Sequence, residues 1–409
     1  MKKLKGYSLP GAMFIMITVS IVLSSLVLGS YFKKQISNKL ELKRKLSEDL
    51  NYSIDFALSQ AENYYDSLIL NGPSFISISK SPWGIYNTIS VKANYRGLKN
   101  AKTVMTSQII SNKNIPVLIV KNSRNVVSLT GNTIINGNVY VPKAYMERAY
   151  VEGKTFTKKQ LVNGRILSIK SYRSVFDNLS FVKRFNGILN SCNLEQLYIS
   201  SLLADSITVS FADDTKLVYA KKEIILDNIV ITGNVIIRSD SLVSIRNSCD
   251  ISNAIIIAPI INIEEGFIGA IQLIASDSIN IGARSELLFP SALILYKSDS
   301  RAPTITINKD CKIHGLVYAY MPNSASANSL ISVKNNTEII GHIYSNSRVD
   351  FKGIMNGALI CDKIIARTNS SYYEDVLIDA KFENNRVPNF MIAGFAFGKE
   401  DNEQVLFEL

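Results

Sequence analysis

The residues whose side chains could do chemistry are few and far apart in this chain. Of 409 residues, two are histidines, His314 and His342, and four are cysteines. The cysteines are Cys192, Cys249, Cys311 and Cys361. Structural zinc sites take ligands in pairs about two to four residues apart, and these cysteines form no such pair. The sequence therefore predicts no metal site and no cofactor, and it favours buried single thiols over a disulfide.

Paired carboxylates, which glycan-cleaving enzymes use as acid and as base or nucleophile, occur at Asp213-Asp214 and Glu264-Glu265. Adjacent residues of a strand point to opposite faces, so neither pair forms a ready two-carboxylate site. The sequence also has no phosphate-binding glycine loop and no nucleophile elbow. We therefore expect no catalytic residues and no enzymatic activity, with a polysaccharide-active protein as the alternative.

The elements that would position any site begin with an apolar segment near the N-terminus. No charged residue occurs between Lys5 and Lys33, and residues 9–28 supply the roughly 20 apolar residues that a membrane-spanning helix needs. A cleaved secretory signal usually has an apolar core of only about 7–15 residues. We therefore predict one membrane crossing within residues 9–32. Its anchoring side chains include Leu9, Phe14, Ile17, Ile21 and Leu26.

Beyond this segment, apolar residues recur at helical spacing as far as Leu68, with charged residues between them. Asn71-Gly72-Pro73 then combines residues that end helices. The pattern predicts one continuous helix over residues 7–72. At about 1.5 Å per residue, the stretch from Tyr7 to Leu70 would be on the order of 96 Å long. Its first part would lie in lipid and its second part outside.

Lys5-Gly6-Tyr7-Ser8-Leu9, followed by this helical pattern, resembles the leader end and first mature residues of the type IV pilin and pseudopilin superfamily. The resemblance implies that the basic leader, residues 1–6, is cleaved between Gly6 and Tyr7. It also implies a helix that anchors the subunit in the membrane before assembly and packs against other pilin-like subunits afterwards. An ordinary uncleaved signal anchor is the alternative.

One position departs from the pattern of that superfamily. The fifth mature residue is normally a glutamate that neutralises the amino terminus of a neighbouring subunit, whereas here it is Gly11. Burying an uncompensated ammonium group costs several kcal/mol. The departure therefore favours a minor or tip subunit, used singly or sparsely, over a major pilin.

The distribution of charge bears on the partners. Of the formal net charge of +11, residues 1–50 carry +6, which leaves +5 for the other 359 residues. This balance is not typical of a nucleic-acid-binding protein, and we predict no nucleic-acid partner. The basic residues beside the apolar segment suit lipid head groups, so the lipid bilayer is the expected partner there, with a merely solvated helix face as the alternative. Both flanks of the segment are basic, so charge does not set its orientation.

From about residue 75 the sequence alternates apolar and polar residues in short segments, which is typical of strands. Helical patterns are limited there to residues 144–150 and 175–185. An internal repeat, in which two spaced apolar residues precede an apolar-x-Gly-x-apolar-Tyr motif, occurs at 127–140, 305–318 and 331–344. The repeats, with two shorter copies, contain Gly137, Gly233, Gly315, Gly341 and Gly357.

Such repeats are typical of chains whose coils bury their apolar face only by stacking on one another. We therefore predict a mainly β fold: a right-handed parallel β-solenoid with a long N-terminal transmembrane and amphipathic α-helix. The repeated glycines would lie at its corners, where the chain turns sharply. A β-sandwich is the alternative. The predicted parts are a small β-rich linking unit at 73–125, the solenoid at 126–370 with an insertion at about 143–195, and a C-terminal cap or tail at 371–409.

Three function classes remain. We favour a minor pilin-like or pseudopilin-like structural subunit that displays the solenoid outside the cell for assembly, adhesion or secretion. The resemblance implies anchoring in the inner (cytoplasmic) membrane, with the C-terminal domain periplasmic or extracellular. The first alternative is a membrane-anchored, polymer-forming scaffold, because the glycine-punctuated repeats also resemble bactofilins. The second is a surface protein that binds or cleaves polysaccharide, with a surface glycan as its partner.

Overall fold

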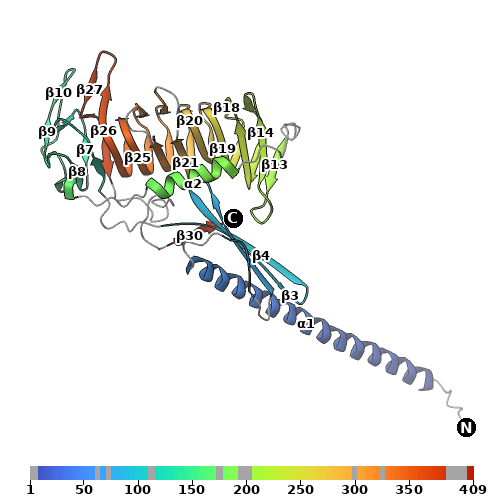
Figure 1. The fold of residues 1–409 in the computed structure, drawn as a ribbon. Coiled ribbons are helices and arrows are strands. Elements are labelled where there is room, and N and C mark those ends of the chain that lie inside the picture. Colours follow the sequence, from blue (N-terminus) through green and yellow to red (C-terminus); the bar gives the residue numbers. More distant parts are fainter. Residues whose placement is uncertain are drawn as a thin grey trace, which may run out of the picture.

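The computed structural model describes residues 8–59, 65–70, 75–108, 116–171, 178–191, 205–296, 302–321, 328–383 and 403–409. The predicted cleavage site at Gly6 and Tyr7 and the helix stop signal at 71–73 lie outside these residues. Figure 1 shows a long helix, an antiparallel sheet on the C-terminal part of this helix, and a stack of strands beyond the sheet. The fold is thus mainly β with one long apolar helix at its N-terminus.

Helix α1 (Ser8–Ser59) has 52 residues and is shorter than predicted. At about 1.5 Å per residue it is on the order of 78 Å long. The prediction of helix for residues 65–70 is wrong, because these residues form strand β1 (Tyr65–Leu70). This strand pairs antiparallel with the next one, Leu70 opposite Ile76. Apolar spacing over so few residues fits either element, and pairing with a neighbouring strand decides between them.

The antiparallel sheet has the strand order β1-β2-β3-β4-β30. Its other strands are β2 (Phe75–Trp83), β3 (Tyr86–Tyr95), β4 (Leu98–Gln108) and β30 (Glu403–Glu408). The C-terminal strand β30 pairs with β4, Glu403 opposite Gln108. Residues 403–408, which lie in the predicted C-terminal cap or tail at 371–409, do not cap the solenoid, since they complete a sheet that begins more than 300 residues earlier in the chain.

The remaining strands, in residues 116–171 and 205–383, form a second body that we call the coil stack. From 205 to 296 its strands are β13 (Ser206–Val209), β14 (Lys216–Ala220), β15 (Ile224–Leu226), β16 (Val230–Gly233), β17 (Val235–Ser239), β18 (Leu242–Ile245), β19 (Asp250–Ile263), β20 (Ile268–Ile281) and β21 (Glu286–Tyr296). The strands that follow are β22 (Thr304–Ile307), β23 (Lys312–Tyr320), β24 (Leu330–Val333), β25 (Glu338–Phe351), β26 (Ile354–Arg367), β27 (Tyr372–Glu374), β28 (Val376–Ile378) and β29 (Lys381–Glu383).

Successive coils pair through three parallel ladders. In the first ladder Ile251 of β19 lies opposite Gly269 of β20, and in the second Ile256 lies opposite Leu273. The third ladder, which includes Ile263 and Ile281, continues through β22, β24 and the ends of β25 and β26. Side chains that face the interior of the stack are mostly Ile, Val or Leu, with some Ala, Phe, Met and Cys, and are buried. The predicted parallel, stacked arrangement of the repeats is therefore present.

Residues 116–171 lie at an unexpected place in this stack. Their strands are β5 (Leu118–Val120), β6 (Val127–Thr130), β7 (Ile134–Ile135), β8 (Val139–Val141), β9 (Met146–Arg148), β10 (Tyr150–Val151), β11 (Lys154–Thr155) and β12 (Ile166–Ser168), followed by a 3-10 turn (Ile169–Ser171). Strand β5 pairs in parallel with β26, β6 with β28, and β7 with β29. The segment therefore continues the stack after residue 383, although it precedes residue 205 in the sequence (Figure 1).

Two boundaries of the predicted domains are consequently wrong. Strand β5 belongs to the coil stack and not to the linking unit. Strands β9 and β12, which lie in the predicted insertion at 143–195, are coil strands that pair in parallel with β6 and β8. The helix predicted at 144–150 is absent, since β9 occupies that place. The second predicted helix is present as α2 (Asn178–Ser191), which lies along the stack (Figure 1).

The five predicted corner glycines all adopt positive φ, between 90° for Gly233 and 149° for Gly315. Three of them are stacked directly, because Gly315 lies opposite Gly341 and Gly341 lies opposite Gly357. A Cβ atom on Gly341 would be 1.9 Å from the carbonyl oxygen of Gly315. The first two ladders meet at this row, so the coils approach one another there more closely than any side chain permits.

Candidate functional site

The first candidate site is the exposed apolar part of α1. The predicted anchor residues are all more than half exposed: Leu9, Phe14, Ile17, Ile21 and Leu26. The helix is long and apolar enough to cross a membrane. Residues 9–32 would be about 36 Å long at about 1.5 Å per residue, against a hydrocarbon core of about 30 Å. Exposed apolar surface of this extent is costly in water, which makes this part of α1 a candidate membrane anchor.

The second part of α1 has different surroundings. Leu46, Leu50, Ile54 and Ala57 recur every three or four residues and are fully buried. They pack against apolar side chains of β2, β3 and β4, namely Ile78, Ile89, Val91, Ala93 and Val104. Helix α1 thus has an N-terminal apolar part that is exposed and a C-terminal part that packs against the sheet.

The sheet is joined to the coil stack through the tip of its β2–β3 hairpin. The indole nitrogen of Trp83 donates to the carbonyl of Asn253 at 3.2 Å. The side chain of Gln272 accepts from the backbone nitrogen of Ile85 at 2.9 Å and donates to the carbonyl of Trp83 at 3.3 Å. Trp83 also contacts Phe211 edge-on, with ring centroids 5.1 Å apart. The apolar residues of this joint, together with those of α2, form a second hydrophobic core outside the coils.

A buried polar cluster lies where the C-terminal strand joins the sheet. Lys80 and Glu403 form an ion pair at 2.5 Å, and both side chains are almost fully buried. The other carboxylate oxygen of Glu403 accepts from Asn87 at 2.7 Å and from Thr106. Arg184 of α2 donates to Asn87 at 2.8 Å and to the carbonyl of Tyr86. Strands β2, β3, β4 and β30 and helix α2 are therefore held together through one carboxylate and one guanidinium group.

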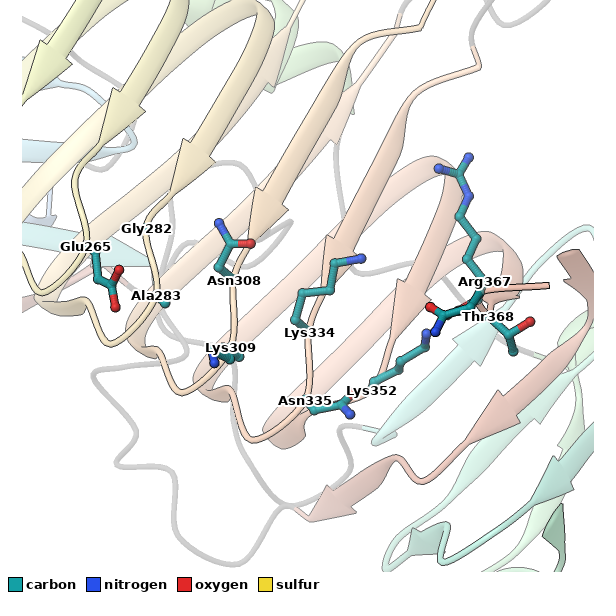
Figure 2. A pocket seen from close by; sticks show the side chains of 11 residues that line it. Glu265, Gly282, Ala283, Asn308, Lys309, Lys334, Asn335, Lys352, Arg367 and Thr368 are labelled. Atoms are coloured by element: carbon teal, nitrogen blue, oxygen red, sulfur yellow. The ribbon is translucent and has the colours of Figure 1, made fainter. Parts of the chain in front are cut away.

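The second candidate site is a groove of about 690 Å³ at the turns that follow the third ladder (Figure 2). Its charged lining residues are Glu265, Lys309, Lys334, Lys352 and Arg367, and its other polar residues are Asn308, Asn335, Thr368 and Asn369. Glu265 is paired with Arg284. Among the described residues, no carboxylate lies within ion-pair distance of the four lining cations. The groove is therefore basic at one end.

Three of these cations occupy equivalent positions in consecutive coils. Val333 lies opposite Phe351, so Lys334 and Lys352 directly follow paired residues of the third ladder. Arg367 takes the same position one coil further, because Asp350 lies opposite Ile365. We call Lys334, Lys352 and Arg367 the cation row. The row was not predicted from the sequence, although a basic residue follows the apolar pattern each time, in Ile331-Ser-Val-Lys334, Val349-Asp-Phe-Lys352 and Ile365-Ala-Arg367.

Asp350 lies beside this row and is almost completely buried. Burial raises the pKa of its carboxyl group, and the nearby Lys352, Lys334 and Arg367 oppose this effect only in part. The ionised form of Asp350 is therefore less favourable in the folded chain than in the unfolded chain.

This perturbation predicts the pH dependence of one substitution. A carboxyl group whose pKa is raised by folding destabilises the folded state at pH values above that pKa, and the penalty disappears as the pH falls. Asp350→Asn should therefore raise the unfolding temperature at pH 8 by a few degrees, the size expected for about 1 kcal/mol. The gain should shrink as the pH falls towards 4. Thermal unfolding at several pH values tests this, with the exposed Asp214→Asn as control; a gain that grows at low pH would contradict it.

The other residues singled out in the sequence do not converge on a site. His314 lies opposite Ile340 and His342 lies opposite Leu316, so the two histidines are not ladder neighbours. Glu264 accepts from Arg246 at 3.1 Å, and Asp213 and Asp214 are exposed in a turn. Cys249, Cys311 and Cys361 are free and buried, as predicted. Burial raises the pKa of all three thiols; Cys192 lies outside the described residues.

Comparisons with known proteins give little further guidance. No protein-family profile matches the chain. No curated protein matches it in sequence. Among solved structures, the competence-associated pilin ComZ from Thermus thermophilus aligns with 89% of this chain and 96% of its own, at 11% identity and a TM-score of 0.28. Both values are too low for this likeness to indicate what the chain does.

Proposed function

We propose that this chain is a minor pilin-like subunit, anchored in the inner membrane by α1, that carries a right-handed parallel β-solenoid outside the cell. The observation that supports this most directly is the division of α1. Its N-terminal part is apolar and bare, whereas its C-terminal part is packed across an antiparallel sheet. A helix with these two parts can be held in lipid and can pack beside the helices of similar subunits without disturbing the sheet.

The joint between sheet and coil stack supports a role in display. The hairpin tip at Trp83 is fixed to the stack through Gln272 and Asn253, and the C-terminal strand returns to the same sheet. Such a joint presents the stack at a defined distance and orientation from the anchor. In this proposal the sheet is the adaptor and the coil stack is the displayed part.

Gly11, at the position where the superfamily normally has a glutamate, supports a subunit that is present in few copies. The apolar part of α1 contains no carboxylate between Ser8 and Lys33. A neighbouring amino terminus packed against this part would therefore stay uncompensated, and its burial would cost several kcal/mol. Repeated stacking along a filament is disfavoured for that reason, whereas a single position at a tip is not. A bactofilin-type scaffold and an uncleaved signal anchor remain the alternatives.

The decisive test is the state of the N-terminus in the membrane-extracted protein. We expect intact-mass and N-terminal analysis to find Tyr7 as the first residue, and we expect Gly6→Leu to leave the leader in place. A protein that starts at Met1 would overturn the pilin-like proposal in favour of the signal anchor. Protease treatment of intact cells or spheroplasts should then digest the coil stack; protection there would place it inside and favour the scaffold.

A matched pair of variants tests the anchor itself. Ile17→Lys combined with Ile21→Lys should move the protein to the soluble fraction, since each charge at a helix centre costs about 2.5–3.5 kcal/mol on insertion. The same two charges at Ser37 and Asn38, on the basic part of the helix beyond Lys34, should leave the protein in the membrane fraction. Equal behaviour of the two variants would show that the apolar part of α1 is not the anchor.

A further inference from the structure

The cation row is unfavourable for folding. Neighbouring strands of a sheet lie about 4.8 Å apart, so Lys334, Lys352 and Arg367 place three like charges at successive steps of one ladder. Like charges at opposed positions destabilise a sheet. The ammonium group of Lys352 donates to the carbonyl of Arg367, which satisfies one donor but removes no charge. The carboxyl group of Asp350 is near all three, and burial disfavours its charge. Packing alone does not explain the row.

The groove gives the row a geometry suited to a linear ligand. Figure 2 shows Asn308, Lys334, Lys352 and Arg367 on successive turns along one edge of the stack. Three steps of about 4.8 Å make this edge about 14 Å long, and one step is close to the length of one sugar residue in an extended polysaccharide. The amide groups of Asn335 and Asn369 can donate to and accept from hydroxyl groups, whereas the amide nitrogen of Asn308 already donates to Asn280 and Ile281 and leaves only its oxygen for a ligand.

The lining also distinguishes between classes of polyanion. Single-stranded nucleic acids are held by aromatic side chains on which their bases stack, and no aromatic side chain lines this groove among the described residues. We propose that the groove binds an acidic polysaccharide, whose carboxylate groups pair with the cation row while its hydroxyl groups bind the asparagine amides. The site does not depend on the proposed membrane anchor or on leader cleavage.

The neighbouring charges limit the site to one end of the edge. Two coils before Lys334 the equivalent position is Gly282, and one coil further back it is Glu264, which is paired with Arg246. Glu265 borders the groove there and is paired with Arg284. A polyanion gains nothing at these neutralised pairs. We therefore expect a short binding register of about three sugar residues, at the Arg367 end.

The test measures binding of polygalacturonate oligosaccharides to the full-length chain in detergent, by calorimetry at low and at physiological salt. Lys334→Gln, Lys352→Gln and Arg367→Gln together should weaken binding at least tenfold. The control carries the same loss of charge at the exposed Lys143, Lys221 and Lys222, each changed to Gln, and should bind within about twofold of the parent. Circular dichroism checks that both variants keep their strand content.

Several outcomes would overturn the proposal. Equal weakening in the control variant would mean that net charge and not the groove attracts the ligand. Failure of the parent chain to bind polygalacturonate, or equal binding of an uncharged polysaccharide such as pullulan, would also exclude an acidic-polysaccharide site. Tighter binding of single-stranded DNA at equal charge concentration, lost in the cation-row variant, would assign the groove to nucleic acid instead.

Discussion

Replacing Glu403 with alanine should lower the free energy of unfolding by about 3–5 kcal/mol, the cost of removing one partner of a buried ion pair. The carboxylate accepts from Lys80, Asn87 and Thr106, so the substitution takes the carboxylate away from a buried ammonium group and removes an acceptor from two buried donors. Trp83 is the only tryptophan of the chain and lies at the joint between sheet and coil stack. Its fluorescence during denaturation should therefore report the loss directly.

Two further variants show whether the buried charge is responsible. Glu408 lies on the same strand and forms a partly exposed pair with Lys102. Glu408→Gln should therefore change stability by less than about 1 kcal/mol. The double change Lys80→Met and Glu403→Gln removes the buried ammonium group together with its carboxylate partner, and it keeps an acceptor for Asn87 and Thr106. It should recover most of the stability lost in Glu403→Ala. Equal losses in Glu403→Ala and Glu408→Gln would show that the pair does not hold the strand.

The same cluster shows which contacts the sequence cannot predict. Lys80 and Glu403 are separated by more than 300 residues, and neither lies in a motif. A lysine in a polar strand segment and a glutamate near the C-terminus are most often solvated. Only the return of the chain end to the first sheet buries them together, and no local pattern encodes that return.

The prediction of repeated parallel strands is confirmed, because it rests on local periodicity. Alternating Ile and Val residues with a glycine at a fixed offset demand buried faces and a sharp corner in every copy, whatever lies next to it. The order of the coils carries no such signal. Ile135 and Gly137 fit the repeat equally well before residue 205 or after residue 383, and pairing of β7 with β29 places them after it. The prediction of helix at Tyr65 and Leu68 is wrong for the opposite reason. The spacing of these residues suits a helix, but they pair with the neighbouring strand β2.

Replacing Gly341 with alanine should cost at least about 3 kcal/mol, since it combines a strained φ with a clash. The residue has φ 141°, and the added Cβ would lie 1.9 Å from the carbonyl oxygen of Gly315. That oxygen belongs to the backbone of the preceding coil, so the clash is relieved only if two coils move apart. Opening them breaks the ladder bonds on both sides of the corner. Far-UV circular dichroism during chemical denaturation measures the loss.

Gly266→Ala separates the cost of backbone strain from the cost of the clash with the neighbouring coil. Gly266 also has positive φ, 81°, but a Cβ atom there would meet no other atom within 4 Å. Its replacement should cost only the backbone strain of about 1–2 kcal/mol. The difference between the two variants therefore measures the close approach of neighbouring coils at the glycine row. If both variants lose the same stability, the row serves only to turn the chain, and the coils would tolerate a side chain at every corner where φ permits one.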